Sequence, residues 1–166
     1  TTTNSGEDWI PRTSGTPDDW RGVSFLNNDS GVAVGFNGSV ILTHDGGATW
    51  NQVYVAEHLL AVDYVDRNLI VAVGYYPGSD IKLMRVLRST NGGTDWVKQT
   101  ITFNWLSSVS FTNSDHGFAV APNGWMFSTR DGGRTWEKTN LAGGFDLNAI
   151  STPVPGVGYT VGIWVT

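Results

Sequence analysis

THDGGATW, at residues 43–50, occurs in close variants twice more in this chain, as STNGGTDW at 89–96 and TRDGGRTW at 129–136. We call these three segments the turn repeats. In each, an Asp or Asn side chain can accept hydrogen bonds from backbone N–H groups further along the chain. The two glycines supply the positive φ angles of a tight turn. The segments therefore predict three copies of one turn, and of the unit that surrounds it.

Four positions of each turn repeat are expected to hold the turn together rather than to carry chemistry. The first hydroxyl can bond within the turn, and the closing tryptophan can bury its ring beside it. These structural residues are Thr43, Asp45, Gly47, Trp50, Ser89, Asn91, Gly93, Trp96, Thr129, Asp131, Gly133 and Trp136. A metal site made from Asp45 and Asp131 is the competing interpretation. It is disfavoured because each turn offers only one such carboxylate, and we expect no metal.

The repetition extends well beyond the turns. GVAVGFNGSVILTHDGGATW at 31–50 matches GFAVAPNGWMFSTRDGGRTW at 117–136 without a gap, 86 residues later, and a looser copy lies between them, so the period is 43. Short apolar runs separated by Gly, Asn and Asp predict strands near 22–26, 31–35, 39–44 and 49–55 in the first unit. Four strands at this period are typical of propeller blades.

Both ends of the chain carry part of a fourth unit. LNAISTPVPGVGYTVG at 147–162 resembles the opening of the other units, and TTNSGEDW at 2–9 reads as a degenerate turn repeat. We therefore predict one all-β domain over residues 1–166, a β-propeller of four-stranded antiparallel blades. The units are expected at about 10–53, 54–99 and 100–140, with a fourth blade split between 141–166 and 1–9.

Closure of such a propeller can be achieved in three ways. An open arc would leave two large apolar faces in water. A closed four-bladed monomer, a ring of two chains with eight blades, or an open head-to-tail fibre would each cover them. Four blades crowd the axis, so completion by oligomerisation is favoured, and a homodimer is the expected form.

Composition excludes several kinds of partner. The net charge is −5 and only 10 residues are Lys or Arg, which disfavours binding to nucleic acid or to an anionic membrane surface. No apolar run approaches the roughly 20 residues of a membrane-spanning helix, so membrane insertion is not expected. The absence of cysteine excludes disulfides and thiolate chemistry. No motif indicates a cofactor.

The turn repeats resemble the Asp-box, or bacterial neuraminidase repeat, of sialidase, xyloglucanase and sortilin-type propellers. The longer stretch WRGVSFLNNDSGVAVGFNGSVILTHDGGATW, at 20–50, is most similar to the photosystem II stability/assembly factor family. This resemblance implies a propeller fold and a protein partner, for instance a pigment-protein subunit. It also favours an extracytoplasmic location, in a periplasm, a thylakoid lumen or outside the cell. Propellers of this family usually have more than four blades, so this chain is shorter than the pattern.

In the proteins that the chain resembles, the working face is the one away from the turn repeats. Three features would lie there: the varied position before the first strand of each unit, a long tyrosine-rich loop in the second unit, and a tryptophan that replaces Ser39 in the third. The candidate binding residues are Asp19, His58, Tyr75, Tyr76, Asp80, Lys82, Trp105, Trp125 and Asp146. Tyrosine offers large contact area at low entropic cost, which favours recognition.

Catalysis is the less favoured interpretation, and no catalytic residue is assigned. Sialidase-like chemistry would need an arginine triad, and Arg12, Arg21 and Arg85 do not reproduce that motif. Inverting glycoside hydrolysis by Asp19 and Asp146 would need carboxylates roughly 6.5–9.5 Å apart. Nothing in their spacing favours this over solvated loop acids.

The sequence thus favours a non-enzymatic binding or assembly module that recognises a protein partner. A carbohydrate-binding or glycoside-hydrolase-related propeller, with a glycan as ligand, is the first alternative. A self-assembling structural subunit is the second.

Overall fold

The structure is a computed structural model, and it describes residues 1–78, 83–101, 105–141 and 144–164. The strands are β1 (Trp20–Phe25), β2 (Gly31–Gly35), β3 (Ser39–Thr43), β4 (Asn51–Tyr54), β5 (His58–Tyr64), β6 (Ile70–Tyr76), β7 (Leu83–Ser89), β8 (Val97–Ile101), β9 (Ser108–Phe111), β10 (Gly117–Val120), β11 (Trp125–Thr129), β12 (Glu137–Asn140), β13 (Phe145–Val154) and β14 (Val157–Trp164). A short 3₁₀ turn, η1 (Phe36–Gly38), joins β2 to β3.

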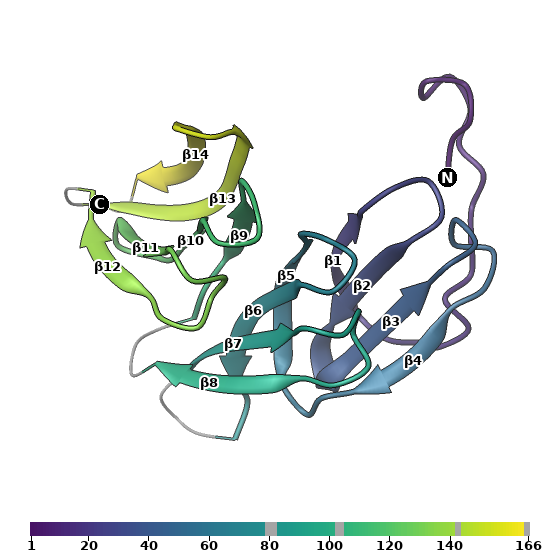
Figure 1. Ribbon diagram of the computed structural model, residues 1–166, viewed down its shortest axis with the longest axis horizontal. Helices are drawn as coiled ribbons and strands as arrows, with labels where there is room; N and C mark the ends of the chain where they lie inside the picture. The colour runs from purple at the N-terminus through teal and green to yellow at the C-terminus, as the bar shows by residue number, and fades with distance from the viewer. Residues whose placement is uncertain (79–82, 102–104, 142–143, 165–166) are drawn as a thin grey trace.

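The strands form four antiparallel sheets, which confirms the all-β propeller fold. Three sheets have four strands in chain order, β1–β4, β5–β8 and β9–β12, and the fourth consists of β13 and β14. Figure 1 shows the sheets along an arc, with β1, β5, β9 and β13 on its concave side and β4, β8 and β12 on its convex side. We call the sheets blades 1 to 4. Within the described residues, no helix has the length and hydrophobicity needed to cross a membrane.

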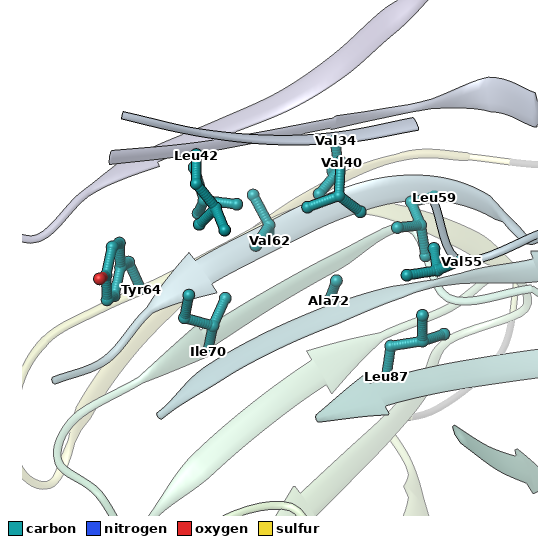
Figure 2. Close-up of a cluster of buried hydrophobic side chains, with 11 residues drawn as sticks. Val34, Val40, Leu42, Val55, Leu59, Val62, Tyr64, Ile70, Ala72 and Leu87 are labelled. Carbon is teal, nitrogen blue, oxygen red and sulfur yellow. The ribbon is translucent and has the colours of Figure 1, made fainter. Parts of the chain in front are cut away.

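The core lies between successive blades. Between blades 1 and 2, Val34, Val40 and Leu42 pack with Leu59 and Val62; Figure 2 shows side chains of the two sheets pointing toward one another. A second cluster of the same kind joins blades 2 and 3 and includes Val73, Val109 and Phe127. Apolar side chains on the two faces of a blade therefore pack against the preceding and the following blade, and they do not form one central core.

Hydrogen bonds from each innermost strand to the next accompany this packing. In all three cases, a side-chain oxygen of one blade accepts a bond from a backbone N–H of the following blade. The pairs are Ser24 Oγ with Tyr64 N (3.0 Å), an Asp63 carboxylate oxygen with Phe111 N (2.7 Å), and Ser110 Oγ with Thr152 N (3.1 Å). These residues occupy equivalent positions of the repeat, so we call them the inter-blade hydrogen-bond column.

The turn repeats share one hydrogen-bond pattern. In the first, the Thr43 hydroxyl donates to Asp45 Oδ1 (2.8 Å) and accepts from the N–H of Gly47 (2.9 Å). The N–H and hydroxyl of Thr49 both donate to the Asp45 carboxylate, at 2.9 and 2.6 Å. These bonds, led by the Thr49 hydroxyl, lower the pKa of Asp45 to about 2. With its oxygens bonded inside the turn, this carboxylate acts as a fastener of the backbone.

The other two turn repeats reproduce this arrangement. Ser89 with Asn91 and Thr129 with Asp131 form the same side-chain bond, at 3.0 and 2.8 Å. The tryptophan N–H groups of Trp96 and Trp136 donate to the carbonyls of Gly93 and Gly133.

Residues 1–9 fold into a fourth such turn. The Thr2 hydroxyl donates to Asn4 Oδ1 (2.9 Å), and the N–H of Gly6 donates back to the Thr2 hydroxyl (3.0 Å). Asn4 also donates to Asp8 (2.9 Å), as Asn91 does to Asp95 in the second turn repeat. This turn lies at the β1 end of the arc (Figure 1) and β14 at the other, so one chain alone does not join them in one sheet. In this structure residues 1–9 and β14 do not share a sheet, and how the split blade is completed stays a prediction.

Candidate binding site

The turn repeats lie at one end of blades 1 to 3, so the other loops of the propeller lie on the opposite face. The N–H groups of Gly46, Gly92 and Gly132 each donate to a carbonyl of the turn between the first two strands of the same blade. Those turns and the turn repeats therefore share one end of each blade. The loops that connect the second strand to the third, and one blade to the next, lie at the other end, which we call the open-loop face.

An aromatic cluster lies on the open-loop face across blades 1 and 2. It consists of the rings of Phe36, His58 and Tyr75. The Phe36 and His58 rings stack with centroids 4.9 Å apart and an interplanar angle of 20°, and His58 Nδ1 lies 3.2 Å from the Tyr75 hydroxyl oxygen. All three side chains are half-buried, which leaves part of each ring facing solvent.

Charged residues flank the aromatic cluster on the blade 1 side. The Arg21 guanidinium carbon lies 4.3 Å from the centroid of the Phe36 ring, within cation–π range. Arg21 also forms an ion pair with Asp19, and both side chains are exposed. In the open, such a pair contributes little to stability, so its groups are available to a ligand at small cost.

On the blade 2 side a buried carboxylate organises two cations. Glu57 is 2% exposed and pairs with Arg85 Nε at 3.2 Å and Lys98 Nζ at 3.0 Å. Arg85 in turn lies over the Tyr76 ring, 4.8 Å from its centroid. A buried carboxylate is tolerated only when paired and hydrogen-bonded, so Glu57 fixes Arg85 and with it the position of Tyr76.

The bulge in the innermost strand sets where these residues point. The strand pairing shifts by one residue in blades 1, 2 and 4, and a glycine faces the start of each shift. The facing pairs are Trp20–Gly35, Leu59–Gly74 and Leu147–Gly162. A Cβ on Gly74 would lie only 1.9 Å from the His58 carbonyl oxygen, so this close approach requires glycine. Blade 3 has Ala121 at the equivalent position, and its β9–β10 pairing starts only at the following pair, Ser108–Val120.

The predicted binding residues divide into two groups. His58 and Tyr75 are in contact over blades 1 and 2, Asp19 pairs with Arg21 beside them, and Tyr76 lies against Arg85. Asp146 accepts a bond from the Asn123 N–H (2.9 Å) and therefore lies beside blade 3.

The remaining predicted residues lie elsewhere. Trp125 lies 5.4 Å from Lys138 Nζ on blade 3, and Trp105 is half-buried in the segment before β9. Asp80 and Lys82 lie outside the described residues. Asp19, His58 and Asp146 each bond within their own or a neighbouring blade, and whether they bind a ligand stays a proposal.

Sequence reasoning missed Phe36 and Glu57 altogether, and considered Arg21 and Arg85 only as members of an arginine triad. A signal for Phe36 existed. Alignment of the first two units places it in the same column as Tyr75, so two successive copies carry an aromatic ring at the start of this loop. The sequence held no comparable sign of Glu57, because its burial depends on Arg85 and Lys98 from two other strands.

Comparison with known proteins identifies the fold. No family model matches the chain, and no curated protein sequence matches it. Among solved structures, YCF48 bound to D1 peptide matches with a TM-score of 0.64 and 19% identity, over 84% of this chain and 48% of that one. YCF48 from Cyanidioschyzon merolae matches with a TM-score of 0.65 and 17% identity, over 88% and 48%. The computationally designed protein Ika4 matches with a TM-score of 0.60 and 12% identity, over 97% and 99%.

These likenesses support the propeller fold and no finer assignment, because all the identities are low. The chain spans about half the length of the YCF48 chains that it matches.

Proposed function

We propose that this chain is a propeller-type binding module that holds a segment of a protein partner on its open-loop face. The observation that carries the proposal is the aromatic cluster of Phe36, His58 and Tyr75, flanked by Arg21. Stacked, half-buried rings offer a rigid apolar surface whose ordering cost is already met in the free protein. The neighbouring guanidinium can donate several hydrogen bonds to carbonyl or carboxylate oxygens of a peptide.

A protein segment is preferred to a glycan for two reasons. The cluster combines an apolar ring surface with one flanking guanidinium group. This arrangement suits a peptide that places an apolar side chain on the rings and a backbone carbonyl or a C-terminal carboxylate beside the guanidinium. The structural neighbour YCF48, which shares the fold, is described bound to a D1 peptide.

Binding is preferred to catalysis because the two carboxylates considered for hydrolysis lie at different blades of this chain, Asp19 on blade 1 and Asp146 beside blade 3. Asp19 pairs with Arg21, and Asp146 accepts the Asn123 N–H.

A peptide-display selection against the immobilised chain tests the proposal. Enriched peptides are measured against the unchanged chain and against Phe36→Ala by fluorescence polarisation. Loss of the central ring is expected to weaken binding at least tenfold, about 1.4 kcal/mol. His44→Ala is the matched control, because His44 is exposed within a turn repeat on the opposite face.

Three outcomes separate the alternatives. A tenfold loss with Phe36→Ala and none with His44→Ala supports the proposal, provided that circular dichroism shows both variants folded. Peptides that bind Phe36→Ala as well as the unchanged chain would place recognition elsewhere. Failure to enrich any peptide, together with binding on a glycan array, would replace the protein partner by a carbohydrate.

A further inference from the structure

The β1 end of the arc exposes apolar side chains that are buried at every equivalent position inside it. Val23 is 64% exposed, whereas its equivalents Val62 and Val109 are 8% and 6% exposed because a preceding blade covers them. Phe25 is likewise exposed, while its equivalents in blades 2 and 3 are buried. Blade 1 therefore carries a complete surface for receiving a preceding blade.

The β14 end shows the complementary surface. Val161 is 64% exposed, whereas Val34, Val73 and Val120 at the equivalent position are all 0% exposed. Tyr159 and Ile163, two residues to either side along the strand, are also exposed. In repeat proteins the terminal units need polar outer faces to stay soluble alone. Here both terminal faces keep the apolar residues of an interior interface.

The inter-blade hydrogen-bond column continues to both ends in the same way. Ser151 aligns with Ser24, Asp63 and Ser110, the three acceptors of the column. Phe25 aligns with the residues whose N–H groups donate to it. The β14 end thus presents the next acceptor of the column, and the β1 end presents the next donor. The β14 end is therefore complementary to a β1 end and not to another β14 end.

We propose that two copies of this chain close head to tail into an eight-bladed ring. The Tyr159–Val161 face of each copy packs on the Val23–Phe25 face of the other, and Ser151 Oγ of each accepts the Phe25 N–H of the other. This continues the interface that joins the internal blades, with valine opposite valine as in the Val34–Val62 packing between blades 1 and 2. Four blades in each of two arcs close the ring by two-fold symmetry.

The ring also accounts for the incomplete fourth sheet. Because β13 and β14 stand alone, Phe118, Met126 and Leu141 of the third blade region line an open cavity of about 260 Å³ beside β14. The preformed turn at residues 2–8 lies at the β1 end of each chain, as Figure 1 shows for one. Closure of the ring would therefore bring the turn of one copy to the incomplete blade of the other. Each chain then supplies the turn that the other chain's fourth blade lacks.

Light scattering after size exclusion tests the proposal directly. The expected mass is twice the chain mass of 18.0 kDa, with no larger species. Val23→Lys and Val161→Lys are each expected to shift the mass to that of one chain, because either change places an ammonium group in both interfaces of the ring. Val97→Lys is the matched control; Val97 is 70% exposed on the outer strand β8, and this variant should stay dimeric.

Disulfide capture gives a second readout that does not depend on disrupting the fold. The chain has no cysteine, so the double variant Val23→Cys/Val161→Cys can form only bonds that the new thiols allow. Oxidation is expected to yield a covalent species of two chains and nothing above it. A mass of one chain for the unchanged protein, a covalent ladder that continues beyond two chains, or dimers that persist in both lysine variants would each overturn the ring.

Discussion

Thr43→Val tests how much the buried hydroxyl of the first turn repeat contributes to the stability of the fold. Valine has nearly the volume of threonine, so packing is kept while the hydroxyl is lost. In the structure the Thr43 side chain is fully buried, and its oxygen accepts from the N–H of Gly47 at 2.9 Å and donates to Asp45 at 2.8 Å. The substitution therefore leaves a buried N–H with no acceptor and removes one donor from an ionised carboxylate.

The magnitude follows from these two losses. The orphaned buried donor alone costs about 1–3 kcal/mol, and the lost bond to the exposed Asp45 carboxylate acts in the same direction. The buried donor corresponds to a fall in Tm of roughly 2–12 °C for a chain of this length. Thermal unfolding followed by tryptophan fluorescence measures it, since Trp50 closes this same turn.

Two matched variants decide whether the buried hydroxyl is the cause. Thr49→Val also removes a hydroxyl from the Asp45 carboxylate, but Thr49 is exposed and no buried group loses its partner. Its loss of stability should therefore be smaller than that of Thr43→Val. Thr43→Ser keeps the bonds and should lose only the methyl contribution, as Ser89 fills this position in the second turn repeat. Equal losses for Thr43→Val and Thr49→Val would refute the reasoning.

Three further predictions concern charge and backbone. The pKa values of Asp45 and Asp131 are lowered to about 2, so their stabilising contribution is present above about pH 4 and is lost as pH falls toward 2. Tm measured from pH 2 to 6 should show this loss. In the Asp45→Asn/Asp131→Asn variant the dependence of Tm on pH should be weaker. Burial raises the pKa of Asp63 above its ordinary value of 3.8, so stability is lost as pH rises above about 3.8 toward the raised pKa of the folded state. Asp63→Asn should therefore raise Tm more at pH 8 than at pH 4, and an equal gain at both would contradict this. Gly74→Ala would bring a Cβ within 1.9 Å of the His58 carbonyl, so it should weaken peptide binding and lower Tm, and unchanged affinity would separate the bulge from the site.

Much of the fold was predictable because the repeat is expressed in local chemistry. Gly-rich turns, short apolar runs and a period of 43 residues predict four-stranded blades, and the strands observed at Trp20–Phe25, Gly31–Gly35, Ser39–Thr43 and Asn51–Tyr54 confirm that pattern in the first unit. Joining of the split blade was not derivable in the same way. Pairing between strands at opposite chain ends depends on the curvature of the whole arc, which no local segment encodes.

The candidate site was only partly predictable because it is built from contacts between blades. His58 and Tyr75 were expected on the open-loop face, because alignment of the units shows which end of a strand each residue occupies. Their meeting with Phe36 depends on the strand bulge that Gly74 permits and on the packing of blade 1 against blade 2. Glu57 shows the limit most clearly, because it looks like a solvated loop acid until Arg85 and Lys98 enclose it.

The two proposals together predict bivalent recognition. Among the residues that the structure describes, the aromatic cluster spans blades 1 and 2, and blade 3 carries Pro122 in the column of Phe36 and Tyr75. A ring of two chains would therefore present two clusters on one face, and linked sites raise avidity by a factor of roughly 10²–10⁴ without new contacts. Val161→Lys should then keep its affinity for a single free peptide but dissociate much faster from a surface densely coated with that peptide. Equal retention of both proteins on the dense surface would show that each cluster acts alone.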